Sequence, residues 1–588
     1  MSQGLKSRVW VSQGLDYTFP EQCLSEVTSK PNIGVCFSGG GTRAMTAAMG
    51  QLRALDKLGI IPKIRYISCV SGGSWASTIY TYYKGTNDAE LLGPVTRAQD
   101  ITKEHVKEGL TPTQLAYGAT KSLVKSVAGW EFSPPSFLLP WLSRSRFSRS
   151  WFSLPWFSPL WEYTSHDVWN YAIGQTYLED HELFDSDVAT KQPDDLPYFS
   201  YDETTINEIK QTNPDLSNKE FLKVHENRPF LIVNSCVLLP QDDPSQDNLI
   251  SFEYTPLTVG RPHLTSFPKN DAPDGTKYGG GFIEPFAYRG GVPNVAPEPI
   301  SDGPSVRPLD STGWVNVPQA KRHYSLTETT GTSSSAFAKD IITTLDISRF
   351  TPEDFYWAVN GMCPYTGKKT LFGDGGLLEN NGIIPLIQRG VELAIVFTNA
   401  DTKLDPHYFP TDHPHDEVND PNGHFDVYIP SLFGYSNSKW EWYYPNNQIF
   451  PTSEFKMVLN ALKAKLATNE PLIVTCQHTV LQNDSWGVKA RQEKMLVTWC
   501  YLDRCAKWEA NLGCEKIRQD IIRGNSSTPE GPYENFPNYK TMFQNGSLDL
   551  VQLTKEQVTL MADFTCDCIL LDSEQTIQKA VESVARSS

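Results

Sequence analysis

A serine lies where the chain is expected to turn sharply from a buried strand into a helix. Ser71 follows the apolar run 64–70, and the small residues 72–74 permit a tight turn that lifts its hydroxyl off the sheet. A hydroxyl held in this way can attack a carbonyl carbon, which makes Ser71 a candidate nucleophile. Close packing of a helix on a strand also explains such small residues, and Cys69 stands where the elbow pattern has its first glycine.

Three consecutive glycines precede this serine by one strand and one helix. Gly39, Gly40 and Gly41 follow the apolar run 33–37, where N–H groups can point at one spot and the helix dipole favours negative charge. The turn is therefore predicted to bind an anion, as the oxyanion hole of an acyl-transfer site. Two alternatives stay open: a purely structural turn and a dinucleotide-binding fingerprint. The fingerprint requires an acidic residue at the end of the next strand, but that strand ends at Ser71 without one.

An aspartate between glycines supplies the candidate base. Asp374 follows an expected strand end at 370–372, and its neighbours Gly373 and Gly375 would let the carboxylate approach another backbone closely. A carboxylate can take the proton of a serine hydroxyl only next to that hydroxyl, in a site dry enough to raise its basicity. The hypothesis is a Ser71/Asp374 dyad, with a plain aspartate turn as the alternative.

Alternating strands and helices are expected to position these residues. The predicted strands are 33–37, 64–70, 370–372, 393–397, 471–475 and 494–499, and the predicted helices are 42–58, 74–83, 385–389 and 504–512. This order predicts an α/β fold with a central, mostly parallel sheet and flanking helices. Between about 87 and 330 the sequence is rich in Pro, Gly and aromatic residues, which predicts a large loop-rich cap insertion. We therefore expect an N-terminal extension over 1–30 and a catalytic domain over 31–588 that contains the insertion.

At its three glycine-containing motifs the chain resembles the catalytic domain of cytosolic phospholipase A and fungal phospholipase B (lysophospholipase), a relative of the patatin-like lipases. The resemblance is clear from about Pro31 to Asp401. Weaker matches follow in the order of that family: Asp167-Val168-Trp169, Phe252-Glu253-Tyr254-Thr255-Pro256, Gly331-Thr332-Ser333-Ser334-Ser335-Ala336-Phe337, and Glu379-Asn380-Asn381 followed by Pro385-Leu386-Ile387.

The resemblance implies a serine acylhydrolase that releases fatty acids from phospholipids or lysophospholipids. Ser71 would attack the ester carbonyl, Asp374 would take its proton and later activate water, and the glycine turn would hold the oxyanion. Arg43 stands where the family has an arginine near the lipid phosphate, a suitable partner for a guanidinium. A surface helix arginine is the alternative interpretation of Arg43.

Charge and apolar content restrict the partners and the location. A net charge of −17, from 51 basic and 68 acidic residues, disfavours nucleic acid, which needs a positive field. Residues 1–10 lack the apolar stretch of a secretory signal and no apolar run is long enough to span a bilayer, so we expect a cytoplasmic protein. The eleven cysteines have no paired CxxC spacing and are expected to be thiols, Cys566 and Cys568 included.

Residues 134–161 are a local exception to the acidic chain. They combine many Trp and Phe residues with Arg144, Arg146 and Arg149 and contain no acidic residue. Aromatic rings beside cationic groups suit a bilayer interface, so this segment predicts transient contact with a membrane surface. An aromatic cap packed over the sheet is the alternative.

The histidines and the overall motif set leave other sites and functions to consider. His407, His413, His415 and His424 fit no standard ligand spacing, and neither a metal nor a cofactor is expected. An ordinary α/β-hydrolase esterase with a Ser-Asp-His triad stays open, with His478 as its candidate base. A lipid-binding scaffold without catalysis is the alternative from a different class of protein.

Overall fold

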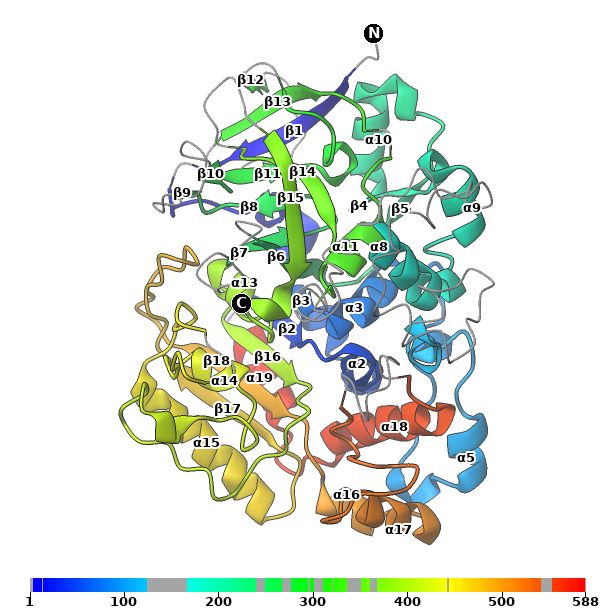
Figure 1. Ribbon diagram of the computed structural model, residues 1–588, viewed down its shortest axis with the longest axis vertical. Helices are drawn as coiled ribbons and strands as arrows, with labels where there is room; N and C mark the ends of the chain where they lie inside the picture. Colours follow the sequence, from blue (N-terminus) through cyan, green and yellow to red (C-terminus); the bar gives the residue numbers. More distant parts are fainter. Residues whose placement is uncertain are drawn as a thin grey trace, which may run out of the picture.

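A large mixed sheet runs along the longest axis of the molecule, with helices packed against it (Figure 1). The computed structural model describes residues 4–12, 14–123, 167–238, 249–266, 277–293, 297–300, 309, 311–320, 322–335, 351–359, 367–440, 444–540 and 552–586. Within these residues the sheet has 14 strands. Twelve lie side by side in the order β12 (Glu298–Pro299), β13 (Ser311–Val317), β1 (Leu5–Val11), β11 (Gly281–Ile283), β8 (Val259–Arg261), β7 (Leu249–Tyr254), β6 (Phe230–Leu238), β3 (Tyr66–Val70), β2 (Ile33–Phe37), β16 (Leu393–Thr398), β18 (Met495–Tyr501) and β17 (Ile473–His478). The other two, β14 (Glu353–Trp357) and β15 (Gly367–Asp374), pair with each other, and β15 also pairs with β6.

The prediction of a mostly parallel sheet is wrong. Only the centre is parallel, where β18, β16, β2, β3 and β6 follow one another in the same direction. Parallel neighbours need a long crossover, and α2 (Gly41–Lys57) provides one between β2 and β3. Beyond β6 the chain turns directly from strand to strand, through β7 and β8, and these pairs are antiparallel.

Helices cover both faces of the parallel centre. The elements predicted around the motifs are confirmed with small shifts of their ends, α2 and α3 (Gly72–Tyr82) among them. The remaining α-helices are α1 (Ser25–Thr28), α4 (Asp88–Leu92), α5 (Lys103–Glu108), α8 (Val168–Ile173), α9 (Ser186–Lys191), α10 (Glu203–Thr212), α11 (Leu326–Thr332), α13 (Ile384–Gln388), α14 (Tyr428–Ser431), α15 (Thr452–Ala467), α16 (Ala506–Ala510), α17 (Glu515–Gly524), α18 (Lys555–Leu571) and α19 (Thr576–Ala585). In the described ranges, no helix has the length and apolar character needed to cross a membrane.

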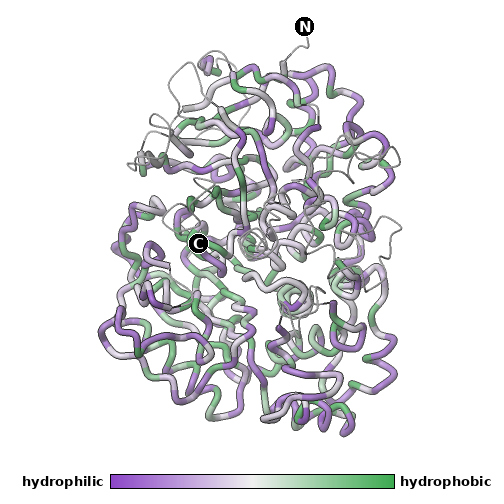
Figure 2. Tube along the Cα trace, in the orientation of Figure 1, coloured by the Kyte–Doolittle hydropathy of each residue, from purple (hydrophilic) through white to green (hydrophobic). Residues whose placement is uncertain are grey.

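The central strands are buried on both faces. Alternate residues of β2 point to opposite sides: Val35 and Phe37 join the core beneath α2 and α3, whereas Cys36 joins the core beneath α13 and α15. Figure 2 shows apolar residues along these inner strands and hydrophilic residues along much of the periphery. A strand with two buried faces is apolar throughout, which is why its sequence predicted it well.

Among the described residues of the middle of the chain, several segments are strands that the composition did not reveal. Residues 87–330 supply β6, β7, β8, β11 and β13 to the main sheet, and β4 (Tyr198–Ser200) and β5 (Phe221–Lys223) to a small one. A second small sheet pairs β9 (Thr265–Ser266) with β10 (Lys277–Tyr278). Strands of two or three residues show no measurable alternation, so the pattern did not reveal them. The domain boundaries stay a prediction, although β1 lies within the expected N-terminal extension and pairs with β13 and β11.

Helix α18 lies directly along α2 (Figure 1). Gly50 of α2 has no room for a side chain, since a Cβ atom there would lie under 3.0 Å from the carbonyl of Ala562 and the hydroxyl of Thr565. The Thr565 hydroxyl donates to the carbonyl of Ala47 at 3.2 Å. A buried ion pair between Arg53 and Asp563 at 2.6 Å adds a polar contact between the two helices.

We expect Gly50→Val to destabilise the fold strongly, because the new side chain must separate α2 from α18. The free energy of unfolding should fall by about 3 kcal/mol or more, measured by chemical denaturation. Gly14→Val is the matched control, since Gly14 has nothing within 4 Å of its missing side chain. Equal stability of the two variants would contradict the close contact of these helices.

Candidate active site

The glycine turn joins β2 to α2. Gly40 and Gly41 have φ angles of 137° and 55°, conformations that residues with a side chain rarely adopt. The N–H of Gly39 donates to the carbonyl of Asn380 at 3.1 Å. Within the described part of the chain, the N–H groups of Gly40 and Gly41 meet no hydrogen-bond acceptor. These two groups, rather than all three, are therefore free to bind an anionic oxygen.

Ser71 occupies a strained turn between β3 and α3. Its φ and ψ are 51° and −123°, outside the regions that an ordinary residue prefers, as in the strand-to-helix turn of a nucleophile elbow. Its N–H donates to the carbonyl of Ser333 at 3.2 Å and to the Ser333 hydroxyl at 3.1 Å. The backbone N–H of the serine thus helps to hold the turn.

The two turns touch each other through their backbones. A Cβ atom on Gly72 would lie under 3.0 Å from the carbonyl of Gly41, and one on Gly73 would collide with the carbonyl of Phe37. A Cβ atom on Gly39 would lie 3.0 Å from the Cβ of Ser71 and closer still to the side-chain oxygen of Asn380. The glycines therefore bring the serine beside the glycine turn, as the sequence interpretation required.

Asp374 reaches the same end of the sheet from β15. In the strand register Asp374 is opposite Ser235 of β6, while Val70, next to Ser71, is opposite Asn234. Because β7 pairs with the other side of β6 over residues 233–238, β3 and β15 lie end to end along one side of β6, and Ser71 and Asp374 both lie where these two strands meet. The aspartate is buried, and its Oδ1 accepts a hydrogen bond from the N–H of Gly376 at 2.7 Å.

Asn380 and Ser333 belong to the site, although sequence reasoning gave them no role. The Asn380 side chain lies against both Gly39 and Gly376, between the glycine turn and the aspartate turn. The Ser333 hydroxyl donates to the carbonyl of Asn234 at 2.6 Å and so connects Ser71 to β6. Both residues lie in segments that resemble the phospholipase family and occur in the order of that family. This resemblance could have identified them from the sequence.

Arg43 is buried, so its interpretation as a surface helix residue is wrong. The guanidinium donates to the carbonyl of Asn399 at 2.9 Å and to that of Tyr539 at 2.5 Å. Burial lowers the pKa of Arg43, and the carboxylates of Asp401 and Asp426 oppose that effect. Because its Nη2 also lies against Gly40, Arg43 supports the glycine turn from behind. Its predicted contact with a lipid phosphate stays a prediction.

The surroundings of the aspartate turn are polar but closed to solvent. The Tyr444 hydroxyl donates to the carbonyl of Gly376 at 3.3 Å. Burial is the largest cause that raises the pKa of Tyr444, and the charges of Asp426 and Asp374 act in the same direction. Burial also raises the pKa of Asp426 to about 7. Asp426 is therefore a stronger base than an aspartate in water.

His478 lies far from the serine, on the edge strand β17. Three strands, β18, β16 and β2, separate β17 from β3. The ring is fully buried: Nδ1 is 2.9 Å from Glu454 Oε2, and Nε2 accepts from Trp499 Nε1 at 3.1 Å. The structure therefore does not bring His478 to the candidate site.

The aromatic segment and the histidines are the remaining features singled out in the sequence. The aromatic segment 134–161 lies outside the described residues. His424 Nδ1 is 2.6 Å from Asp405 Oδ2, and His415 Nδ1 is 2.8 Å from the carbonyl oxygen of Ser436. Across the described ranges, no group of three or more His, Cys, Asp or Glu side chains is arranged to hold a metal ion.

Comparisons with known proteins find a family match over the segment that contains the glycine turn and the serine elbow. Residues 33–102 match the family described as "Lysophospholipase catalytic domain". The matched segment contains Gly39–Gly41, Arg43 and Ser71 but not Asp374. The resemblance expected from the sequence motifs is thereby confirmed.

The similar proteins are phospholipases and lysophospholipases. Cytosolic phospholipase A2 zeta of Mus musculus is 40% identical over 88 residues, which is 15% of this chain and 10% of that protein. Lysophospholipase 1 of Candida albicans is 43% identical over 111 residues, 17% of this chain and 16% of that protein. The matches thus span a small part of each relative. Among solved structures, human GIVD cytosolic phospholipase A2 aligns with 97% of this chain and 63% of its own, at 13% identity and a TM-score of 0.44.

Arg43→Lys should lower the melting temperature measurably, since an ammonium group cannot donate to both Asn399 and Tyr539 in the geometry of the guanidinium. Loss of one buried hydrogen bond to a charged donor costs about 1.5–3 kcal/mol. Arg586→Lys, at an exposed position, is the control and should leave thermal unfolding unchanged. A fully stable Arg43→Lys variant would show that the guanidinium does not support the turn.

Proposed function

We propose that this protein is a serine acylhydrolase that releases fatty acids from phospholipids or lysophospholipids through a Ser71/Asp374 dyad. The family of residues 33–102 and the names of the relatives support the substrate class. The observation that carries the chemistry is the strained backbone of Ser71, held in contact with a glycine turn whose Gly40 and Gly41 N–H groups meet no acceptor among the described residues.

The first half of the proposed reaction acylates the enzyme. Asp374 takes the proton of the Ser71 hydroxyl as the serine oxygen attacks the ester carbonyl. The N–H groups of Gly40 and Gly41 donate to the oxyanion that forms. When the tetrahedral intermediate collapses, the C–O bond to the leaving alcohol breaks, and the alcohol oxygen takes the proton from Asp374.

The second half releases the fatty acid. Asp374 takes a proton from water, which attacks the acyl carbon of the serine ester, and the same two N–H groups hold the second oxyanion. The bond to Ser71 breaks, and the serine oxygen recovers a proton from Asp374. One carboxylate serves both steps, which is why the proposed mechanism uses no histidine.

Ser71→Ala and Asp374→Asn should each lower kcat/KM for fatty acid release by at least about a thousandfold, because each removes a group that acts in the transition state. The assay is a panel of diacyl and lyso phospholipids with fatty acid release as the readout. Ser77→Ala is the matched control, a buried serine of the same helix outside the site. A fluorophosphonate probe should label wild type and not Ser71→Ala; a folded wild type that stays unlabelled would contradict the proposal.

His478 distinguishes the dyad from the alternative triad. His478→Gln keeps a side chain that can hydrogen-bond near Glu454 and Trp499, and the dyad predicts kcat/KM within about threefold of wild type for the folded variant. A triad predicts a loss as large as that of Ser71→Ala. Circular dichroism of both variants separates a catalytic loss from a failure to fold.

The proposed setting is the cytoplasm, with transient contact to a membrane surface through residues 134–161. The relatives named cytosolic and the thiol state of the described cysteines support the first part. The aromatic and arginine-rich composition of the segment supports the second.

Trp151→Ala combined with Trp156→Ala should weaken binding to phosphatidylcholine vesicles, because two interfacial rings are removed. Sedimentation with the vesicles is the measurement, and kcat on a monomeric soluble ester is the control that should not change. Vesicle binding equal to that of wild type would assign the segment to the protein interior instead.

A further inference from the structure

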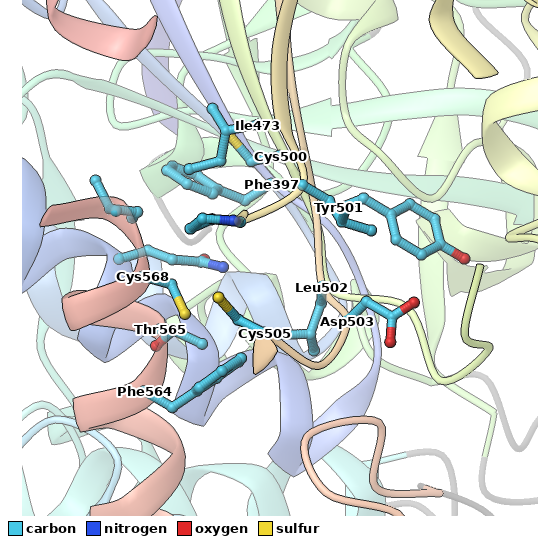
Figure 3. A pocket seen from close by; sticks show the side chains of 14 residues that line it. Phe397, Ile473, Cys500, Tyr501, Leu502, Asp503, Cys505, Phe564, Thr565 and Cys568 are labelled. Atoms are coloured by element: carbon cyan, nitrogen blue, oxygen red, sulfur yellow. The ribbon is translucent and has the colours of Figure 1, made fainter. Parts of the chain in front are cut away.

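Two cysteines from distant parts of the chain face each other across a small pocket. Cys505 lies between β18 and α16, and Cys568 lies on α18. Figure 3 shows their sulfur atoms pointing toward one another, and the Cys505 thiol donates to the carbonyl of Asn469 at 3.5 Å. Adjacent thiols on separate elements are the arrangement from which a disulfide can form with little movement of the backbone.

The pocket gives a small oxidant access to this pair. It is lined by Cys500, Cys505, Phe564, Thr565 and Cys568 among others, and it is partly open to solvent (Figure 3). The cavity has a volume of about 40 Å³, enough for roughly three waters. Hydrogen peroxide fits such a space, whereas a peptide disulfide such as oxidised glutathione does not.

The local polar groups favour reaction at Cys505. The hydrogen bond from the Cys568 thiol lowers the pKa of Cys505, and the backbone N–H groups of Lys507 and Trp508 act in the same direction. Burial raises the pKa of Cys568 and of Cys500 well above the ordinary value for a thiol. Because the thiolate is the nucleophile, Cys505 should react before the other thiols of the pocket.

We propose that Cys505 and Cys568 form a reversible disulfide when the protein meets hydrogen peroxide. The reaction proposed above uses neither thiol.

The oxidation proceeds in two balanced steps. The Cys505 thiolate attacks one oxygen of hydrogen peroxide, the O–O bond breaks, and the products are Cys505 sulfenic acid and hydroxide. The Cys568 sulfur then attacks the Cys505 sulfur; the S–S bond forms, the S–O bond breaks, and the thiol proton leaves with the hydroxyl group as water. Each sulfur has lost one electron, and peroxide has been reduced to two molecules of water. An added dithiol reverses the change by thiol–disulfide exchange.

The crosslink would fix α18 to the end of the parallel sheet. Cys505 follows β18, which pairs with β16, and α18 packs along α2. A bond between these elements restrains the unfolded chain over the long loop that it closes, so the oxidised protein should melt several degrees higher than the reduced one.

The test is peptide mapping of the full chain before and after exposure to hydrogen peroxide, with alkylation during denaturation. We expect a Cys505–Cys568 crosslinked peptide after oxidation, its loss after treatment with a dithiol, and a reversible rise in melting temperature. Cys500 and Cys566 are the matched controls. Both are buried thiols that should remain reduced in peroxide and should therefore be alkylated on denaturation. Full alkylation of Cys505 and Cys568 after peroxide, or oxidation of all four cysteines alike, would overturn the proposal.

A single variant tests the order of the steps. In Cys568→Ser the second step cannot occur, so the sulfenic acid of Cys505 should persist and be trapped by dimedone. A Cys505 that stays unmodified in this folded variant would show that the peroxide does not react there. Should the variant fail to fold, the peptide map of wild type still decides whether the disulfide forms.

Discussion

The whole site depends on one contact in which two polypeptide backbones lie against each other without side chains between them. Gly72 and Gly73, which begin α3, rest on the carbonyl of Gly41 at the start of α2 and on that of Phe37 at the end of β2. Any side chain at these glycines would separate the two helices and move the serine away from the N–H groups of the glycine turn. The parallel strands β2 and β3 fix the spacing of the two turns, because their hydrogen bonds set one register for both.

The parallel centre and the antiparallel part of the sheet position different residues of the candidate site. The centre holds the glycine turn and the serine elbow, which lie within about one strand–helix–strand unit of sequence. The antiparallel part delivers more distant residues to them: β15 brings Asp374 beside β6, and the segment after α11 brings Ser333 to the N–H of Ser71. Trp169 Nε1 donates to the carbonyl of Gly331 at 2.8 Å and so anchors that segment from a third part of the chain. The candidate site therefore combines one continuous segment, from the glycine turn to the serine elbow, with residues from distant parts of the chain.

Much of the frame could be predicted from sequence, because its strands are buried on both faces and its helices show regular apolar spacing. The 33–37 strand and the helix after the glycines were located almost to the residue for that reason. The antiparallel part could not be predicted in the same way. Val259–Arg261 and Gly281–Ile283 are too short to show a period, and their pairing depends on tertiary contacts. Asn380 was missed because its role comes from two glycines, Gly39 and Gly376, that leave space for its side chain. The burial of Arg43 was missed because its partner Tyr539 lies almost 500 residues further along the chain.

The packing of α18 against α2 also has a consequence for biosynthesis. Helix α2 is synthesised long before α18, so its surface at Gly50 stays uncovered by α18 until Ala562 and Thr565 have been made. Contacts between such distant residues are slow to form, and the uncovered surface is prone to associate with other chains. The nascent chain therefore carries an uncovered surface on α2 until α18 has been synthesised.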